Sequence, residues 1–474
     1  MPLLVPILLS LGTGFAIVCL SWPRRGLRSE LLLKLSLAMG LGLGTSSLIY
    51  FLSLPLHALS RGILLIIELS LLGSLTAALF FINSMVSIKV KYTHSSQLRA
   101  EDSSSMTWAL GPVFCLAVVS AFYVFISFFY NHPHGSWDAW MTWNLRARFF
   151  FRAGDYWRDA FSPLLEGAHP EYPVLLPSIV ARIWKYVGRE TELAPMLCST
   201  LFTFATVALM FSSLRFLRSK SQGFLGGLVL LGSPFFVRHG ASQYADVPLS
   251  FFFLASLVLL CLSDRASSGG RGLLFLTGMA VGFGAWTKNE GMLFLVSMFL
   301  ASAAVMIPKY GFKAYGGKVL GFAPGLVVVL PVIAYFKLQL AAPEPLFALS
   351  RATLHHLFDW SRYSQILIVF LREGLRFGNW RFDLVLVLPF YFLLLGMGVK
   401  EEEQRGIFIS GMTLALMLAG YFAVFLMTQY EPLAELLYST VPRLLFQLWP
   451  SAVFLFFLLV RTPEQVLNEN SGMA

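Results

Sequence analysis

A polar stretch interrupts an otherwise apolar sequence at residues 131–190, and it contains the first candidate for chemistry. Asp138 stands there in the segment SWDAWMTWNLRARFFF, close to Arg146 and Arg148. Burial favours the neutral form of a carboxyl and a neighbouring cation favours the charged form, so an aspartate in this setting can be tuned toward general-base catalysis. The structural alternative is an aspartate that caps a helix within an aromatic belt.

Asp246 is a second acid in a position suited to chemistry, in YADVPLSFFF at the start of an apolar run. It lies two residues before Pro248, where an aspartate is an ordinary helix N-cap. If Asp246 and Asp138 lie on the same membrane face, their carboxylates could frame a single cavity. The sequence leaves both interpretations open.

A purely structural role explains the positions of two cations, Lys288 and Arg443, poorly. Lys288 occupies a tight turn in GAWTKNEGMLF, together with the acid Glu290. Arg443 opens an apolar run in VPRLLFQLWP, where the helix dipole disfavours a positive charge. Either cation could hold a lipid phosphate. In the structural alternative, Lys288 extends toward water and pairs with Glu290.

The segment GAHPEYPVLLP adds groups that can hydrogen-bond a sugar hydroxyl or a phosphate. The residues that we expect to contact substrate are Trp137, Trp140, His169, Glu171, Tyr172, Tyr244 and Glu290. A metal site that combines His132 and His134 with Asp138 is the alternative for the polar stretch. Histidines two apart share a face only in a strand, and Pro133 favours a turn. We therefore expect no metal ligands and no cofactor, with a divalent cation as the alternative.

The composition places these residues in a membrane protein. Of 474 residues 57% are hydrophobic and only 13% are charged, and the mean hydropathy is +0.71, far from the values of a soluble domain. The net charge of +10 comes from short basic clusters between apolar runs, which is a topology signal rather than a nucleic-acid surface. The four cysteines fall within apolar runs and suggest neither a disulfide framework nor a metal site.

About thirteen apolar runs are long enough to cross a bilayer, which needs about 20 residues. The fold class is therefore an all-α polytopic membrane protein. Glu68 is the one acid well inside a predicted span, so we expect it to be neutral or paired, with Arg61 as the candidate partner. The predicted spans are 3–22, 31–53, 62–86, 107–130, 192–216, 222–238, 246–263, 271–287, 290–307, 318–340, 382–398, 405–427 and 443–460.

Every alternate connection between these runs is basic, which predicts that its side is the cytoplasm, with the amino terminus outside and the carboxyl terminus inside. The candidate residues then share the outer face. Two outer loops are long, 131–191 and 341–381, and each contains an amphipathic stretch expected to lie at the membrane interface. The cations of the basic connections are Arg24, Arg25, Arg28, Lys89, Lys91, Arg99, Arg215, Arg218, Lys220, Arg265, Arg271, Lys309, Lys313, Lys318, Lys400 and Arg405.

The motifs in this order resemble the GT-C superfamily of integral-membrane glycosyltransferases, which includes protein O-mannosyltransferases and the bacterial transferase that adds aminoarabinose to lipid A. The matching segments are WDAW, HPEYPVLLP, YADVPLSFF, WTKNEGMLF and VPRLLFQLWP, spread over residues 107–460. The resemblance implies a GT-C-like bundle, with a catalytic module in residues 107–474 and interfacial helices in its large outer loop. Three helices and a cytoplasmic loop in residues 1–106 precede this module, more helices than many relatives carry.

The resemblance also implies a reaction, in which a sugar moves from a polyprenyl-phosphate-linked donor to a hydroxyl of a glycan, lipid or protein. It implies the periplasmic face of a bacterial cytoplasmic membrane. Lys288 and Arg443 would hold the donor phosphate, with Arg146 or Arg148 as further candidates. Asp138 would be the base of an inverting displacement and Asp246 would position a substrate. Metal-dependent relatives tend to carry paired acids, whereas this loop reads Asp-Ala-Trp, so a metal-independent reaction is expected.

Two other classes of function are open to a polytopic membrane protein. A transporter or flippase of lipid-linked sugars would place ionisable residues near the bilayer midplane, often in inverted repeats. Here the acids fall in outer loops and the sequence shows no convincing repeat. A non-catalytic scaffold of the cell envelope would tolerate the loss of both aspartates.

Overall fold

The computed structural model describes residues 2–23, 31–56, 60–85, 105–152, 154–266, 270–343, 351–378, 384–399 and 403–471. Apart from an isolated bridge between Met397 and Val460, their regular secondary structure is helical. Nine helices in these residues are long and apolar enough to cross a membrane, or up to ten if two helices that meet at 66° form one span. These findings confirm an all-α, multi-pass membrane protein but not the number thirteen.

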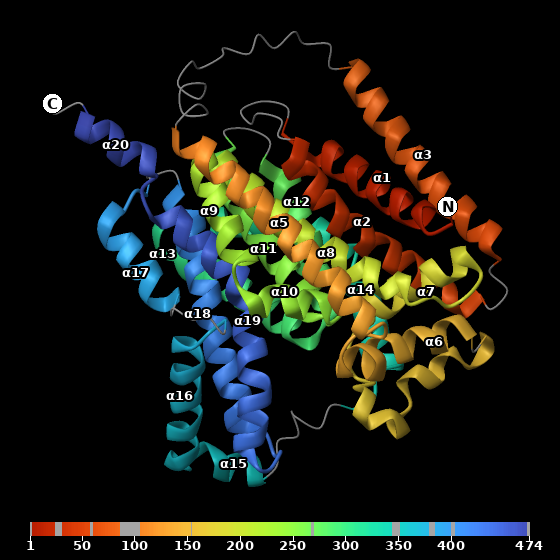
Figure 1. The fold of residues 1–474 in the computed structure, drawn as a ribbon. Coiled ribbons are helices and arrows are strands. Elements are labelled where there is room, and N and C mark those ends of the chain that lie inside the picture. Colours follow the sequence, from red (N-terminus) through yellow and green to blue (C-terminus); the bar gives the residue numbers. More distant parts are fainter. Residues whose placement is uncertain are drawn as a thin grey trace.

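The elements follow one another along the coloured ribbon of Figure 1. They are α1 (Leu4–Ser21), α2 (Leu31–Ser53), η1 (Leu54–Leu56), α3 (Arg61–Met85), α5 (Ser105–Asn131), η2 (Ala139–Trp143), α6 (Asn144–Arg152), η3 (Gly154–Phe161), η4 (Pro163–Ala168), α7 (Leu175–Val187), α8 (Leu193–Leu217), α9 (Lys220–Leu231), α10 (Pro234–Ala241), α11 (Asp246–Arg265), α12 (Gly270–Thr287), α13 (Asn289–Val327), α14 (Leu330–Gln339), α15 (Arg351–Leu357), α16 (Trp360–Leu375), α17 (Leu384–Leu395), α18 (Gln404–Met427), α19 (Leu433–Leu459) and α20 (Pro463–Ser471).

The centre of the bundle is α11, which packs against α8, α12 and α19 (Figure 1). Its sequence is apolar on every side, and nearly all of its side chains are buried. A helix that is apolar all round belongs inside a bundle. At 1.5 Å per residue, its 20 residues extend over about 30 Å, the thickness of a bilayer core. Its two ends carry the acids Asp246 and Asp264, so it separates two polar sites.

The far end of α11 gathers cations from several predicted cytoplasmic connections. Asp264 accepts hydrogen bonds from Lys318 at 3.1 Å and Arg405 at 2.5 Å. Nearby, Glu403 pairs with Arg218 at 3.1 Å and more loosely with Arg265. These connections therefore meet at one end of the bundle. The cations Arg24, Arg25, Arg28, Lys89, Lys91, Arg99 and Lys400 lie outside the described residues.

Several predicted spans differ in detail from the observed helices. The spans predicted at 290–307 and 318–340 correspond to α13 and α14, and α13 is interrupted at Gly311, whose φ is +80°. The rings of Phe299 and Phe322, from the two halves of α13, lie 6.1 Å apart, so the halves run side by side. The span predicted at 382–398 is represented by α17, whose 12 residues extend only about 18 Å.

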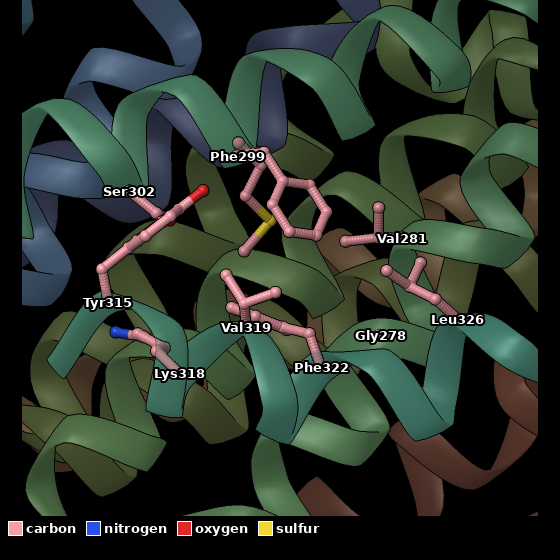
Figure 2. Close-up of a pocket in the computed structure, with 10 residues that line it drawn as sticks. Gly278, Val281, Phe299, Ser302, Tyr315, Lys318, Val319, Phe322 and Leu326 are labelled. Carbon is pink, nitrogen blue, oxygen red and sulfur yellow. The ribbon is translucent and has the colours of Figure 1, made fainter. Parts of the chain in front are cut away.

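A hollow of about 320 Å³ lies between α12 and the two halves of α13. In Figure 2, Phe299 and Ser302 from one half face Tyr315 and Phe322 from the other. Its lining is mainly apolar, and Lys318 connects it to Asp264. The hollow therefore adjoins the end of α11 that carries Asp264.

Glu68 is paired, but with a partner other than the predicted Arg61. Its carboxylate accepts hydrogen bonds from Arg182 of α7 at 2.5 and 2.7 Å and from the Tyr186 hydroxyl at 2.7 Å. Arg182 also donates to the Pro6 carbonyl at 3.1 Å. This buried network joins α3, α7 and α1, so the amino-terminal helices pack on the same bundle. The division at residue 106 stays a prediction.

The two predicted interfacial stretches pack against the protein. The first is α7, where every side chain except Lys185 and Val187 is buried. Neighbouring helices thus cover both faces of α7, and its position at the membrane surface stays a prediction. The second stretch forms α15 and α16, and α16 packs along α18 and α19 (Figure 1). Its buried side chains include Ile366 and Val369.

Candidate active site

Five charged side chains that are distant in sequence meet at the start of α11. Asp138 precedes η2, Asp246 is the first residue of α11, and Arg443 lies in α19. Lys288 and Glu290 flank the tight junction between α12 and α13. The packing of α11 against α12 and α19 brings these residues together although they are far apart in the sequence. We call this group the carboxylate cluster.

Asp246 is the fully buried centre of the carboxylate cluster. Its Oδ1 accepts hydrogen bonds from Lys288 Nζ at 3.0 Å and from Gln447 Nε2 at 2.7 Å. Its Oδ2 accepts two from Arg443, at 2.8 and 3.1 Å. Asp246 lies inside α11, after the capping residue Ala245, and caps nothing with its side chain. The N-cap alternative is therefore wrong, and Asp246 is a fixed anchor for two cations.

Arg443 connects the buried acid to the loop acid. Its Nη2 donates to Asp138 Oδ2 at 2.6 Å as well as to Asp246, and its guanidinium lies 4.9 Å from the centre of the Tyr244 ring. The side chains of Arg443 and Asp138 are 25% and 24% exposed, so a ligand can reach both. Asp138 makes no capping hydrogen bond, which removes the structural alternative for this residue too.

Lys288 is buried between two acids and an aromatic ring. Its Nζ donates to Asp246 at 3.0 Å and to Glu290 Oε1 at 2.8 Å, and it lies 5.6 Å from the centre of the Tyr172 ring. Burial alone would lower the pKa of Lys288, but the two carboxylates outweigh burial and raise it. The structural alternative for Lys288 had two parts. The predicted pair with Glu290 is present, but the ammonium group is buried and does not extend into water.

Gln447 and Tyr421 are members of the site that the sequence interpretation missed. Gln447 lies one helical turn after Arg443, so both point to the same side of α19. Its amide nitrogen donates to Asp246 and, at 3.2 Å, to Glu290, while its oxygen accepts from the Tyr421 hydroxyl at 2.9 Å. The i, i+4 spacing from Arg443 was an available signal, although a glutamine in an apolar helix is not distinctive alone.

Glu290 has an unused acceptor in this network. Its Oε1 binds Lys288 and Gln447, but the buried Oε2 has no hydrogen-bond partner among the described residues. A buried carboxylate oxygen without a partner is costly. Glu290 is therefore suited to accept a hydrogen bond from a substrate hydroxyl.

The HPEYP segment forms one wall of the site through Tyr172. The Tyr172 ring faces Lys288 and stacks on His169, with ring centres 4.7 Å apart. His169 Nδ1 and Glu171 Oε1 are 3.0 Å apart. Burial raises the pKa of Glu171, but contacts with His169 and Arg146 outweigh burial and lower it. Lys337 fixes this segment by donating to the Glu171 carbonyl at 2.8 Å.

Arg146 and Arg148 do not join the cations of the carboxylate cluster, contrary to the predicted phosphate role. Arg146 is fully buried and donates to the Tyr172 carbonyl at 2.6 Å. Burial lowers its pKa to about 10. Arg148 instead lies 3.4 Å from Glu190 in a separate polar pocket. Arg146 thus supports the Tyr172 segment, and the loop sequence alone could not show which way either guanidinium points.

Trp137 and Trp140 form an exposed pair beside Asp138. Their ring centres are 4.7 Å apart in an edge-to-face arrangement, and the residues are 61% and 40% exposed. Exposed indoles of this kind suit a sugar face or the headgroup layer of a membrane. Their predicted role in substrate binding stays a prediction, as does that of Tyr244, whose ring lies against Arg443.

The acids of the cluster face cations of the protein itself. Asp138 and Asp246 share the Arg443 guanidinium, while His132 stacks on Phe128 with ring centres 4.7 Å apart. Within the described parts of the chain, no three His, Cys, Asp or Glu side chains are grouped as metal ligands. The alternative in which His132, His134 and Asp138 share a metal is not supported by this geometry.

Comparison with known proteins adds one match. Residues 169–335 match the family model of the dolichyl-phosphate-mannose-protein mannosyltransferases. No curated protein and no solved structure matches the chain. The matched region contains Tyr172, Asp246, Lys288 and Glu290, while Asp138 and Arg443 lie outside it. Together with the helical membrane fold, this match confirms, over residues 169–335, the predicted resemblance to the membrane glycosyltransferases of the GT-C superfamily.

Proposed function

We propose that the protein transfers a sugar from a polyprenyl-phosphate-linked donor to an acceptor hydroxyl at the carboxylate cluster. The observation that carries the proposal is the Arg443 guanidinium, which binds the partly exposed Asp138 and the buried Asp246 together. The matched family acts on a lipid-phosphate sugar, and mannose is therefore the first sugar to test. The basic connections at the opposite end of α11 support a site on the non-cytoplasmic face, and the resemblance to bacterial relatives favours the periplasmic face of an inner membrane.

The donor phosphate binds Arg443 first in this mechanism. Arg443 is the partly exposed cation of the site, whereas Lys288 lies behind it, occupied by Asp246 and Glu290. A guanidinium binds phosphate through paired, charge-assisted hydrogen bonds. Arg443, backed by the charge of Lys288, then stabilises the negative charge that develops on the leaving phosphate.

Asp138 is the proposed base because Asp246, the other acid that pairs with Arg443, is more strongly held. Both oxygens of Asp246 are hydrogen-bonded by cations or by Gln447, but the observed contact of Asp138 is through Oδ2 alone. When the phosphate takes over Arg443, Asp138 Oδ2 is released from its ion pair and is free to accept a proton from the acceptor hydroxyl. Phosphate binding and base activation are thereby linked through one guanidinium.

The displacement proceeds in a single step. The acceptor hydroxyl gives its proton to Asp138 as its oxygen bonds to the anomeric carbon. The bond from that carbon to the phosphate oxygen breaks, and the polyprenyl phosphate leaves as an anion on Arg443. Configuration at the anomeric carbon is inverted. Asp246 holds Arg443 and Lys288 in place, the acceptor is a glycan, lipid or protein hydroxyl, and no metal is required.

Substitution of Asp138 by Asn tests the mechanism. Asp138→Asn keeps the shape of the side chain, so the purified protein should fold while transfer of mannose from a polyprenyl-phosphate donor falls about 10²- to 10⁴-fold. Asp159→Asn, an exposed aspartate of the same large loop, is the matched control and should retain activity. Retention of more than about a tenth of wild-type transfer by Asp138→Asn would show that Asp138 is not the base.

A further inference from the structure

A second polar hollow lies beside the loop that carries Asp138. It has a volume of about 340 Å³, part of which is open to solvent, and its lining includes His134, Asn144, Arg148, Glu190, Thr191 and Glu192. These side chains come from the loop before η2, from α6 and from the connection between α7 and α8. The proposed transfer reaction assigns no role to this polar pocket.

The walls of the polar pocket are held by specific contacts. Glu190 bonds Arg152 and lies 3.4 Å from Arg148. Trp184 donates its indole N–H to the Thr191 carbonyl at 2.9 Å, which fixes the loop that carries Glu190. The pocket is thus a preorganised set of donors and acceptors.

The polar pocket and the carboxylate cluster share one segment of the chain, and a hydrogen bond joins it to a second segment, which begins α11. One segment runs from His134 to Asn144 and contains Asp138. The other contains Gln243 and, three residues later, Asp246. The Asn144 amide donates to Gln243 Oε1 at 3.4 Å, and this contact joins the segments. A ligand in the polar pocket would therefore lie next to the loop of the proposed base.

The charges of the polar pocket favour a neutral, hydroxyl-rich ligand. The lining sets Arg148 against Glu190 and Glu192, so the pocket offers no excess positive charge to an anion. Hydroxyl groups both donate and accept, which matches guanidinium groups and carboxylates set side by side. The exposed lining is more polar than apolar, which is unsuited to a hydrocarbon chain.

We infer that the polar pocket binds a sugar ring of the acceptor, an inference that rests on the proposed transfer reaction. In a single displacement the acceptor approaches the anomeric carbon from the side opposite the leaving phosphate. The phosphate is assigned to Arg443, and Asp138, which contacts Arg443, lies in the segment that also lines the polar pocket. The pocket thus selects a carbohydrate acceptor over a lipid or protein hydroxyl.

Direct binding tests this inference without depending on catalysis. Saturation-transfer NMR on the purified full chain would use methyl glycosides of mannose, glucose and galactose as probes. At least one should bind the wild type, and Arg148→Gln and Glu190→Gln should each weaken it at least about tenfold, because each removes a charge-assisted hydrogen bond. Arg189→Gln, an exposed arginine of the same face, is the matched control and should bind normally.

Three outcomes would overturn the inference. The pocket does not bind sugar rings if no glycoside binds the wild type, or if Arg148→Gln and Glu190→Gln bind as well as Arg189→Gln. Displacement of the glycoside by an isoprenyl-phosphate mannose, but not by the isoprenyl phosphate alone, would assign the pocket to the donor sugar. The same titration with Asp138→Asn separates the two proposals, since the glycoside should still bind there even if the catalytic role of Asp138 is disproved.

Discussion

At the scale of single residues, Arg443 gives Asp246 and Asp138 different roles. It binds Asp246 through two nitrogens and Asp138 through one, so the buried acid is held more firmly than the loop acid. Residue chemistry made Asp138, Asp246, Lys288 and Arg443 candidates from the sequence alone. These four residues meet at one point because of the way α11, α12 and α19 pack. The local sequence around each residue does not show that packing.

Tyr421→Phe should lower transfer by roughly tenfold. The Tyr421 hydroxyl donates to Gln447 Oε1 and so directs the amide nitrogen toward Asp246 and Glu290. Without it a buried acceptor loses its partner, which costs about 1–3 kcal/mol of stability. Tyr50→Phe removes another buried tyrosine hydroxyl, bonded to the Phe150 carbonyl, and should affect unfolding without affecting transfer. Equal activities of the two variants would exclude an orienting role for Tyr421.

Lys288→Met should destabilise the protein by about 3–5 kcal/mol, because Asp246 and Glu290 then lose their shared cation in a buried site. Glu290 loses its ion pair in this variant whereas Asp246 keeps Arg443, so addition of Glu290→Gln should restore part of that loss. Reversible unfolding in mixed micelles would measure both variants. The double variant should remain inactive in transfer, since Asp246 and the donor phosphate still lack Lys288. A double variant no more stable than Lys288→Met would contradict the assigned ion pairs.

Helix α7 shows the limit of sequence patterns at the scale of elements. The alternation of PVLLPSIVARIWKYVG correctly predicts a helix with one polar side. It cannot tell whether lipid headgroups, water or protein cover that side, and here Glu68 from a distant helix pairs with Arg182. The same limit explains Arg146 and Arg148, whose direction is set by the backbone of the Tyr172 segment and by Glu190.

Arg182→Met should destabilise the bundle by about 3–5 kcal/mol, because it leaves the buried Glu68 without its cation. Glu68→Gln combined with Arg182→Met should be less harmful, since no isolated charge remains. Lys185→Met, on the same helix but only partly buried, is the control and should change stability little. Thermal unfolding in detergent would compare the three. The network is structural if the destabilised variants keep their transfer activity at low temperature.

At the scale of the whole molecule, α11 runs between two polar sites that contain different charged residues. One end holds the carboxylate cluster, and the other holds Asp264 with Lys318 and Arg405. The alternation of basic connections predicts this division, because each connection returns the chain to one of two sides. The number of crossings is harder to predict, since a broken helix such as α13 and a short one such as α17 look alike in hydropathy.

The two ends lead to a prediction about membrane orientation. In a chain whose four native cysteines are replaced, Arg189→Cys, exposed in the connection between α7 and α8, should react with an impermeant maleimide on intact spheroplasts. Lys309→Cys, exposed in the chain between the two spans predicted at 290–307 and 318–340, should react only after the membrane is opened. The physical reason is the positive-inside bias of the basic connections. The reverse labelling pattern would place the carboxylate cluster in the cytoplasm and require the lipid-linked donor to act from the inner leaflet.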